Sequence, residues 1–264
     1  MTDVAQPIGA GVVIAAVAPL HQEPRIASQQ ISQRLAGARV EVLEELGDWL
    51  RVRGEDGYEG WMHRGYVRDP ASLAPTPLVS LGCVVRSGQG MVRPLPLGAR
   101  LAPDDVLVDG EAITEAERAT RFPSRPAAII DSALRYFEGT SYQWGGLTPW
   151  GSDCSGFVQS IFALHGVKLP RDAWQQSLLG RSAGRDILEL GPSDLLFFSD
   201  RDDRWITHVG ISLGGRRMAH VALGRGGYAV EQLDDPMDPY VAKLRERFLF
   251  GRRVPMLAEP PVRG

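Results

Sequence analysis

Hydrophobic and polar positions divide the chain into three segments with different periodicities. The first, residues 1–69, holds short apolar runs typical of β-strands, VVIAAVA, ARVEVLEEL, DWLRVRG and YEGWMH, with turn residues between them. Residues 70–77, PASLAPTP, have the composition of a stiff linker. The second segment, residues 78–120, is also β-like, and its LGARL echoes the earlier AGARV. An echo this short leaves open whether the two segments are copies of one module.

Residues 124–254 change to a mixed pattern. The run SRPAAIIDSALRYFEG combines an early proline, apolar positions at helical spacing and a closing glycine, which together predict a helix. CSGFVQSIFALHG predicts a second helix that buries Phe157, Ile161 and Leu164 on one stripe. Five strand-like runs follow, DLLFFS, HVGISL, RMAHVAL, YAVEQL and FLFGRRV. This order predicts an α+β fold with an antiparallel sheet packed on the helices, and residues 255–264 form a tail.

The composition is that of an ordinary soluble chain. Its 264 residues suggest two or three compact units, and 44% of them are hydrophobic and 23% charged. A net charge of -3 gives no reason to expect nucleic acid or an anionic membrane as a partner. Two distant cysteines, Cys83 and Cys154, do not make a disulfide framework. Without a Cys or His cluster at ligand spacing, or a phosphate-binding loop, we expect no metal and no other cofactor.

The apolar run GAGVVIAAVAPL, residues 9–20, allows two interpretations. It has the length of a signal-peptide core, but a secretory signal starts with positive charge, and Asp3 is the only charged side chain before residue 9. We therefore predict a buried β-strand and a protein of the cytoplasm. No run approaches the roughly 20 apolar residues that span a bilayer.

Cys154 stands where a glycine-rich loop meets the second predicted helix. Unpaired N–H groups at a helix N-terminus favour the thiolate, so this position predicts a nucleophile with a lowered pKa. Ser152 is the expected N-cap, and Gly145, Gly146 and Gly151 would leave room for a substrate. The alternative is a buried cysteine that acts only as a small hydrophobic residue.

Two histidines lie in the strand-like runs after the helices. His208 occurs in ITHVGISL and His220 in RMAHVAL, and on paired strands both can face the same side. They suit a general base and a third group that orients it. The alternative is a pair of hydrogen-bonded core histidines, the class in which we place His21, His63 and His165. His165 also stands at a helix end, where a cation is favoured.

The motifs YQWGG, SDCSGFV, LPRDAWQQ, DLLFF, THVGI and MAH occur in this order within residues 124–254. Together they resemble the NlpC-type cysteine peptidases, which cleave bacterial cell-wall peptides. The resemblance implies a papain-like catalytic domain in which Cys154 is the nucleophile, His208 the base and His220 the third polar residue.

The same resemblance implies a set of substrate-binding positions. One matches a tyrosine near the cysteine, and the others shape the pocket or bind D-glutamate: Tyr142, Trp144, Asp153, Ser155, Arg171 and Asp172. Ordinary alternatives are aromatic core for the first two and a solvated helix start for the last two. The chain departs from the family at Ser193, usually glycine, and at Ala173, often serine, which would remove one hydrogen bond to substrate.

Residues 1–69 resemble a bacterial Src-homology-3-like (SH3-like) domain through GDWLRVRGEDGYEGWM, and residues 78–120 do so weakly, which implies two small all-β barrels before the peptidase. This arrangement resembles the γ-D-glutamyl–diamino acid endopeptidases of the dipeptidyl-peptidase VI type. There a tyrosine, matched by Tyr58, and an acid of the first domain bind the substrate's amine. Gln29 stands where some relatives have that acid, which leaves Glu23 and Glu59 as candidates. The alternative for Tyr58 is an ordinary strand aromatic.

The implied function is hydrolysis of the γ-D-Glu–diamino acid bond in small muropeptides with a free N-terminal L-Ala, as in cell-wall recycling. Three alternatives remain: an exported hydrolase of intact peptidoglycan, a muropeptide-binding protein with weak turnover, and acyl transfer to an amine. The sequence leaves open whether the diamino acid is diaminopimelate or lysine, and what the oligomeric state is.

Overall fold

The computed structural model describes residues 6–70 and 77–255, in two compact units, Met1–Glu117 and Arg118–Gly264. Helix α1 (Glu115–Arg121) runs across the boundary between them. Most of the predicted linker and of the C-terminal tail lies outside the described residues. No helix in the described parts of the chain is long and apolar enough to cross a membrane.

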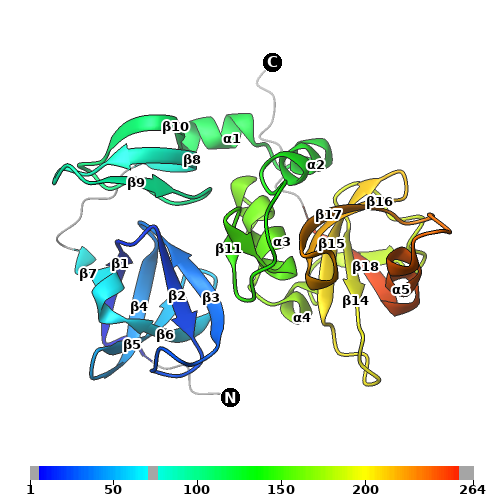
Figure 1. Ribbon diagram of the computed structural model, residues 1–264, viewed down its shortest axis with the longest axis horizontal. Helices are drawn as coiled ribbons and strands as arrows, with labels where there is room; N and C mark the ends of the chain where they lie inside the picture. Colours follow the sequence, from blue (N-terminus) through cyan, green and yellow to red (C-terminus); the bar gives the residue numbers. More distant parts are fainter. Residues whose placement is uncertain (1–5, 71–76, 256–264) are drawn as a thin grey trace. The chain divides into compact units, whose positions relative to one another are not determined.

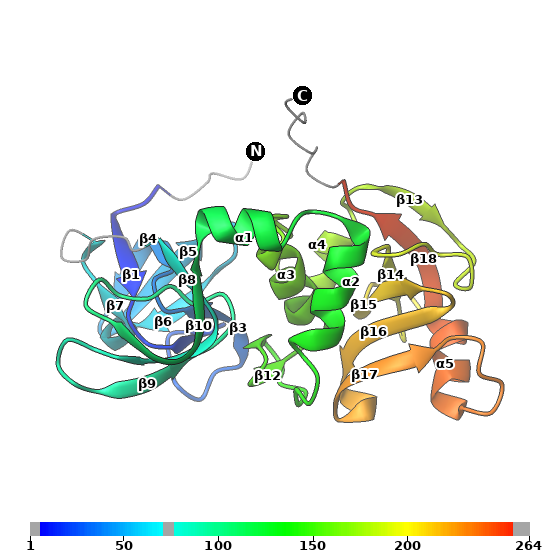
Figure 2. The same cartoon turned by 90° about the horizontal axis from the view of Figure 1, so that it is seen from above.

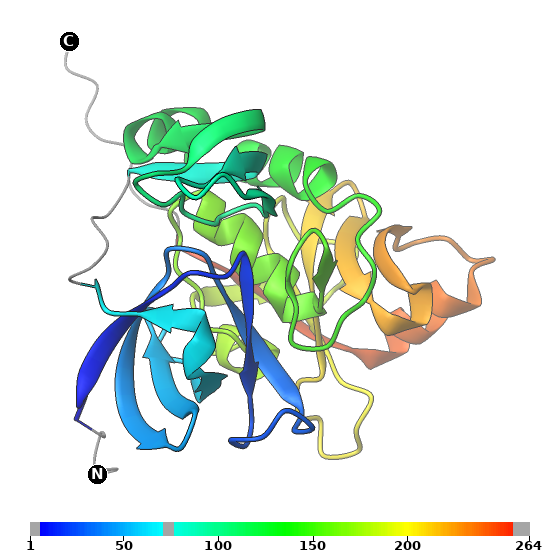
Figure 3. The same cartoon turned by 60° about the vertical axis from the view of Figure 1, so that its left-hand side comes forward.

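The first unit begins with a curled seven-stranded antiparallel sheet, drawn in blue and cyan (Figures 1 and 3), in the order β3-β2-β6-β5-β4-β1-β7. Its strands are β1 (Gly9–Val13), β2 (Val17–His21), β3 (Gln30–Leu35), β4 (Arg39–Leu46), β5 (Trp49–Gly54), β6 (Glu59–His63) and β7 (Val67–Arg68), with the 3-10 helix η1 (Arg64–Tyr66) before β7. The sheet closes around a core that includes Leu20, Val52 and Met62. The prediction of one strand over residues 9–20 is wrong, because the chain changes neighbours within the run: β1 pairs with β4 and β7, and β2 with β3 and β6.

The second β-like segment of this unit forms a three-stranded antiparallel sheet. Its strands are β8 (Leu78–Arg86), β9 (Val92–Leu95) and β10 (Val106–Thr114), in the order β10-β8-β9. Cys83 and Val85 share a core cluster with Ala36 of the first segment, and Arg93 donates to the Ile14 carbonyl at 2.6 Å. The segment therefore forms an open sheet whose buried residues pack against the end of β3, and a second barrel is not confirmed.

The second unit is built on a six-stranded antiparallel sheet in the order β13-β18-β14-β15-β16-β17. Its strands are β13 (Arg181–Gly184), β14 (Leu195–Phe198), β15 (His208–Gly214), β16 (Arg217–Ala222), β17 (Gly227–Gln232) and β18 (Phe248–Arg253). Its helices are α2 (Pro126–Arg135), α3 (Cys154–Leu164), α4 (Ala173–Gln176) and α5 (Pro239–Arg247). The predicted α+β order of two helices and five strands is confirmed, and β13, α4 and α5 come in addition.

Helices cover both faces of this sheet (Figure 2). Helix α3 contacts β15 and β16, while Leu244 of α5 shares a core cluster with Leu196 and Phe198 of β14. The predicted apolar stripe of α3 is buried, but so are Val158 and Phe162 on other sides of the helix. Helix α3 is thus a central helix, which fixes the position of its first residue, Cys154.

Candidate active site

A short hairpin delivers the chain to the start of α3. Its strands are β11 (Leu147–Thr148) and β12 (Gly151–Ser152), and the next residue, Asp153, is the N-cap. The Asp153 carboxylate accepts a hydrogen bond from the Gly156 N–H at 2.7 Å. The prediction of Ser152 as N-cap is wrong: the Ser152 hydroxyl donates to the Asp153 carbonyl instead, at 3.0 Å. Carboxylate and hydroxyl are both good caps, and the hairpin decides which one reaches the helix.

Arg171 holds this N-cap in place through hydrogen bonds. Its guanidinium donates to both carboxylate oxygens of Asp153, at 3.0 and 2.5 Å, and to the Ser155 hydroxyl at 2.8 Å. The Gly145 N–H donates to the same carboxylate at 2.9 Å. Arg171 is only 1% exposed, so its interpretation as a solvated helix start is wrong. These contacts join loop, cap and helix into one rigid support for Cys154.

The glycines of the loop make room for the protein's own backbone. A Cβ on Gly146 would lie 2.4 Å from the Gly151 carbonyl oxygen, and one on Gly156 would lie 2.0 Å from that of Gly146. A Cβ on Gly151 would meet the Gln143 side chain at 2.1 Å. The prediction that Gly146 and Gly151 leave space for a substrate is therefore corrected: the space is filled within the fold.

The Cys154 thiol is buried, with 8% of the residue exposed. Burial raises the pKa of this thiol to about 12, and the Asp153 charge raises it further. Hydrogen bonds from the backbone of Val209 and Ser155, and the charge of Arg171, act in the opposite direction but are weaker. The prediction of a lowered pKa is wrong, because desolvation outweighs the helix terminus. At rest Cys154 is therefore a neutral thiol, which would need a base to become a nucleophile.

The two predicted histidines lie side by side, and one of them is next in the chain to a residue that contacts this thiol. His208 begins β15 and directly precedes Val209, whose backbone contacts the Cys154 sulfur. His208 Nε2 is 2.8 Å from Nδ1 of His220 on the neighbouring strand β16. Burial, followed by the charges of His220 and Arg247, lowers the pKa of His208 well below its usual value. His208 is therefore neutral at physiological pH and able to accept a proton.

A carboxylate that the sequence analysis missed continues this row. His220 Nε2 is 3.2 Å from Oε1 of Glu231. Arg225 donates one hydrogen bond to each carboxylate oxygen of Glu231, both at 2.8 Å. The only signal in the sequence was a charged residue inside the apolar run YAVEQL. His220 and Glu231 are both buried.

The structure brings some of the expected substrate-binding residues close to Cys154. Tyr142 forms a bridge with Ser152, and burial together with the charges of Cys154 and Asp153 raises its pKa. Trp144 is 58% exposed, so its interpretation as aromatic core is wrong. Asp172 is the N-cap of α4, where its N–H donates to Gln175 Oε1 at 3.3 Å. Their contacts with a substrate stay predictions, as do those of Asp153, Ser155 and Arg171.

Tyr58 belongs to the first unit, in the turn between β5 and β6. Arg34 ties down this turn by donating to both Asp56 carboxylate oxygens and, at 3.0 Å, to the Tyr58 carbonyl. The Tyr58 side chain is half-buried against the core. The candidate acids are both ion-paired, Glu23 with Arg25 and Glu59 with Arg51 and Arg53. The role of Tyr58 toward an amine stays a prediction.

The structure corrects one further expectation, for His165, and accounts for the residue type usual at one departure from the family, Ser193. His165 is buried, with Nδ1 2.8 Å from the Pro123 carbonyl and Nε2 2.9 Å from the Ser132 hydroxyl. Burial lowers its pKa, so it is a neutral core residue and not a helix-end cation. Ser193 has φ of 62°, the left-handed region that favours glycine, which accounts for the glycine usual in the family.

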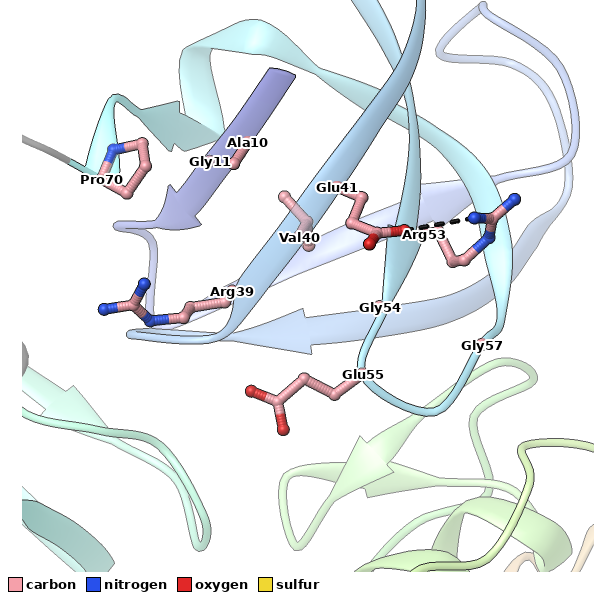
Figure 4. A pocket seen from close by; sticks show the side chains of 10 residues that line it. All are labelled: Ala10, Gly11, Arg39, Val40, Glu41, Arg53, Gly54, Glu55, Gly57 and Pro70. Carbon is pink, nitrogen blue, oxygen red and sulfur yellow. Dashed lines mark hydrogen bonds and ion pairs between the residues drawn. The ribbon is translucent and has the colours of Figure 1, made fainter. Parts of the chain in front are cut away.

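A hollow in the first unit lies apart from these residues (Figure 4). Its walls come from β1, β4 and the β5–β6 turn, and they carry Arg39, Glu41, Arg53 and Glu55. Glu41 and Arg53 pair across it at 3.2 Å. None of the predicted site residues lines it. Within residues 6–70 and 77–255, no group of three or more His, Cys, Asp or Glu side chains is arranged to hold a metal ion.

Comparison with known proteins identifies the chain. The NlpC/P60 family model matches residues 139–244, which include Cys154, His208 and His220, and a bacterial SH3 domain model matches residues 16–68. The γ-D-glutamyl-L-lysine dipeptidyl-peptidase of Bacillus subtilis is 43% identical over 212 residues, covering 72% of this chain and 71% of the relative. The chain belongs to the NlpC/P60 family. It is accordingly a cysteine peptidase.

Other relatives extend the likeness along the chain. Dipeptidyl-peptidase 6 of Lysinibacillus sphaericus is 26% identical over 261 residues, covering 85% of this chain and 92% of the relative. The crystal structure of an NlpC/P60 family protein from Bacillus cereus has a TM-score of 0.75 at 20% identity and covers 93% of this chain and 99% of its own. This crystal structure and the present chain therefore share their fold along most of their lengths.

Proposed function

We propose that this NlpC/P60 peptidase hydrolyses the γ-D-Glu–diamino acid bond of small muropeptides that carry a free N-terminal L-Ala. The observation that carries the proposal is the buried Cys154 thiol at the start of α3, in contact with the backbone next to the hydrogen-bonded pair His208–His220. The bond is suggested by the relatives from Bacillus subtilis and Bacillus cereus, which are named γ-D-glutamyl-L-lysine dipeptidyl-peptidases.

The first half of the reaction forms a tetrahedral intermediate on Cys154. The Cys154 sulfur attacks the γ-carbonyl carbon of D-glutamate while its proton passes to His208, which is neutral and so able to take it. Negative charge then develops on the carbonyl oxygen. The N–H groups of Cys154 and Ser155, in the first turn of α3, are the donors for this oxygen, and one such donor is worth roughly 10²–10³ in rate.

The second half releases the products. The His208 imidazolium gives its proton to the departing amine of the diamino acid, which breaks the C–N bond and leaves an L-Ala-γ-D-Glu thioester on Cys154. His208 then removes a proton from water as the water attacks the thioester. The thiolate leaves, is protonated by His208, and free L-Ala-D-Glu departs.

A substrate with a free amine has already been cut from the wall, which suits recycling in the cytoplasm. In intact wall peptides this amine is blocked by muramic acid. A hydrolase of free muropeptides and a hydrolase of intact peptidoglycan therefore differ in whether they require a free N-terminal amine, which acetylation removes. In this proposal Tyr142 and Trp144 line the pocket, and Asp172 contacts the D-glutamate.

The test is mass spectrometry of products from L-Ala-γ-D-Glu-L-Lys, its diaminopimelate counterpart and the N-acetylated forms of both. We expect L-Ala-D-Glu from the free peptides only. A peptide joined through the α-carboxyl of D-glutamate is the matched control and should stay intact. Cleavage of acetylated peptides at the same rate, or release of peptides from intact sacculi, would overturn the recycling role. Cleavage of the α-linked control would overturn the γ-glutamyl assignment.

A further inference from the structure

Three charged side chains continue the hydrogen-bonded row of the two histidines, those of Glu231, Arg225 and Asp238. Glu231 on β17 is buried between His220 and Arg225. Arg225, in the 3-10 turn η3 (Leu223–Arg225), also makes a short contact with Asp238, the N-cap of α5. No step of the proposed reaction uses these three residues. Because they form a continuous chain of contacts that ends on His220, they can act on the reaction through that ring.

The sheet register aims Glu231 at His220. His220 pairs with Ala229 across β16 and β17, and Glu231 is two residues further along β17, so its side chain is on the same face as that of His220. Burial raises the pKa of Glu231, but hydrogen bonds from His220 and Arg225 outweigh this and lower it to about 2. The carboxylate is therefore ionised and can only accept hydrogen bonds.

An acceptor at this end fixes the protons of both rings. Because the Glu231 carboxylate accepts, His220 Nε2 must carry the hydrogen in their contact. A neutral His220 then has a lone pair on Nδ1, so the hydrogen in the contact between the rings belongs to His208 Nε2. A neutral His208 with hydrogen on Nε2 has its lone pair on Nδ1. That nitrogen is the one left for the Cys154 proton.

We propose that Glu231, held by Arg225, is a positioning residue that fixes the tautomers of His220 and His208 and so makes Nδ1 of His208 the catalytic base. The inference rests on the proposed cysteine-peptidase reaction but not on the identity of its substrate. Without an acceptor at position 231, a neutral His220 can place its hydrogen on either nitrogen, and in the wrong tautomer His208 presents an N–H to the thiol.

Arg225 is the residue that keeps Glu231 in this orientation. It contacts both carboxylate oxygens, and its own position is set by Asp238 and by the Tyr240 ring, whose centroid is 4.4 Å from the guanidinium carbon. The Tyr240 ring also lies beside that of His220, with centroids 6.1 Å apart. The other charge acting on the pair is Arg247 at the end of α5.

Glu231→Leu removes the acceptor, and Glu231→Gln retains an oxygen that can take its place. We expect kcat to fall roughly 10–100-fold in Glu231→Leu, by analogy with the outer-shell groups that orient metal-binding histidines, with KM little changed. Glu231→Gln should recover part of this loss. The matched control is Asp234→Asn, which breaks the exposed Arg216–Asp234 pair at the end of the same strand and should leave kcat unchanged.

The direct measurement is nitrogen-15 nuclear magnetic resonance of the protein with labelled histidine side chains, near neutral pH and without substrate. It distinguishes a protonated ring nitrogen from one with a lone pair. The wild-type protein should show hydrogen on Nε2 of both His208 and His220, and Glu231→Leu should show a mixture of tautomers. Because no substrate is needed, this result is independent of whether the γ-D-Glu bond is the one cleaved.

Three outcomes would overturn the proposal. The first is a doubly protonated His220 in the wild-type protein. The second is an unchanged tautomer in both Glu231 variants. The third is an unchanged kcat in Glu231→Leu with wild-type tautomers lost. If Glu231→Leu does not fold, Glu231→Gln and Arg225→Gln carry the test, since each weakens the contact without removing all polar groups.

Discussion

Two arginine–carboxylate pairs support the two parts of the candidate active site, and they differ in what surrounds them. Arg171–Asp153, beneath the nucleophile, is 1% and 8% exposed and is surrounded by backbone groups and a hydroxyl. Arg225–Glu231, behind the histidines, is 30% and 5% exposed and ends on an imidazole. The first pair contacts backbone groups and the Ser155 hydroxyl, so its role is to hold the loop rigid. The second can influence where protons reside.

The largest effect is expected from breaking the buried pair. Arg171→Met leaves the Asp153 carboxylate buried without its cation, which typically costs about 3–5 kcal/mol. Urea denaturation measures this loss directly. The matched control is Arg216→Met, whose exposed pair with Asp234 should contribute no more than about 1 kcal/mol. A loss in Arg171→Met as small as in the control would show that the pair does not support the loop.

The thiol provides the next test, because it shares the buried environment of Asp153. With the pKa of Cys154 raised to about 12, alkylation by iodoacetamide near neutral pH should be at least roughly a hundredfold slower than for an ordinary thiol of pKa about 8.5. The rate should keep rising with pH beyond that value. Peptide mapping separates Cys154 from Cys83, and the urea-unfolded protein gives the reference rate. A rate that is already maximal in mild acid would instead indicate a thiolate–imidazolium pair.

These two tests concern features that the sequence alone did not reveal. The position of Cys154 at a helix start was predictable because the glycine-rich loop and the apolar period meet there. Its surroundings were not predictable, because Arg171 is buried where it donates to Asp153, 18 residues earlier in the chain, and to Ser155. The choice of Asp153 over Ser152 as N-cap also depends on the hairpin before the helix. Local propensity identifies the kind of cap, and tertiary contacts select the residue.

The same limit explains the missed residues behind the histidines. The strands carrying His208 and His220 were predicted correctly, and their shared face followed from antiparallel pairing. Glu231 required the register of β16 against β17, which turn residues in the sequence do not fix. In the seven-stranded sheet the sequence predicted one strand where there are two. The apolar run over residues 9–20 lacks alternation, so it gave no sign that β1 pairs with β4 and β2 with β3.

Breaking the more exposed pair should affect stability less. Arg225→Met is expected to cost about 1–3 kcal/mol, because the guanidinium is partly exposed and water can replace some of its hydrogen bonds. Thermal and urea unfolding, run beside Arg171→Met, give the comparison. An equal or larger loss in Arg225→Met would contradict the division between a structural and a proton-positioning pair.

The smallest effect concerns His165 at the opposite end of α3 from Cys154. Its folded-state pKa is lowered by burial, so the unfolded chain binds the proton more tightly and stability is lost as pH falls below the unfolded value of about 6.5. The loss is at most about 1.4 kcal/mol for each pH unit. Urea unfolding at neutral and mildly acidic pH should therefore show a flatter pH dependence in His165→Gln than in the wild-type protein. Identical slopes would rule out His165 as a source of acid sensitivity.

The most direct test of the whole account is the rate of L-Ala-D-Glu release from L-Ala-γ-D-Glu-L-Lys by the wild-type protein, Cys154→Ala and Cys83→Ala. Cys83 is the matched control, because it is also buried but lies in the first unit. We predict that Cys154→Ala loses all measurable release while Cys83→Ala keeps the wild-type rate. Release by Cys154→Ala at a rate close to that of the wild-type protein would contradict the assignment of Cys154 as the nucleophile.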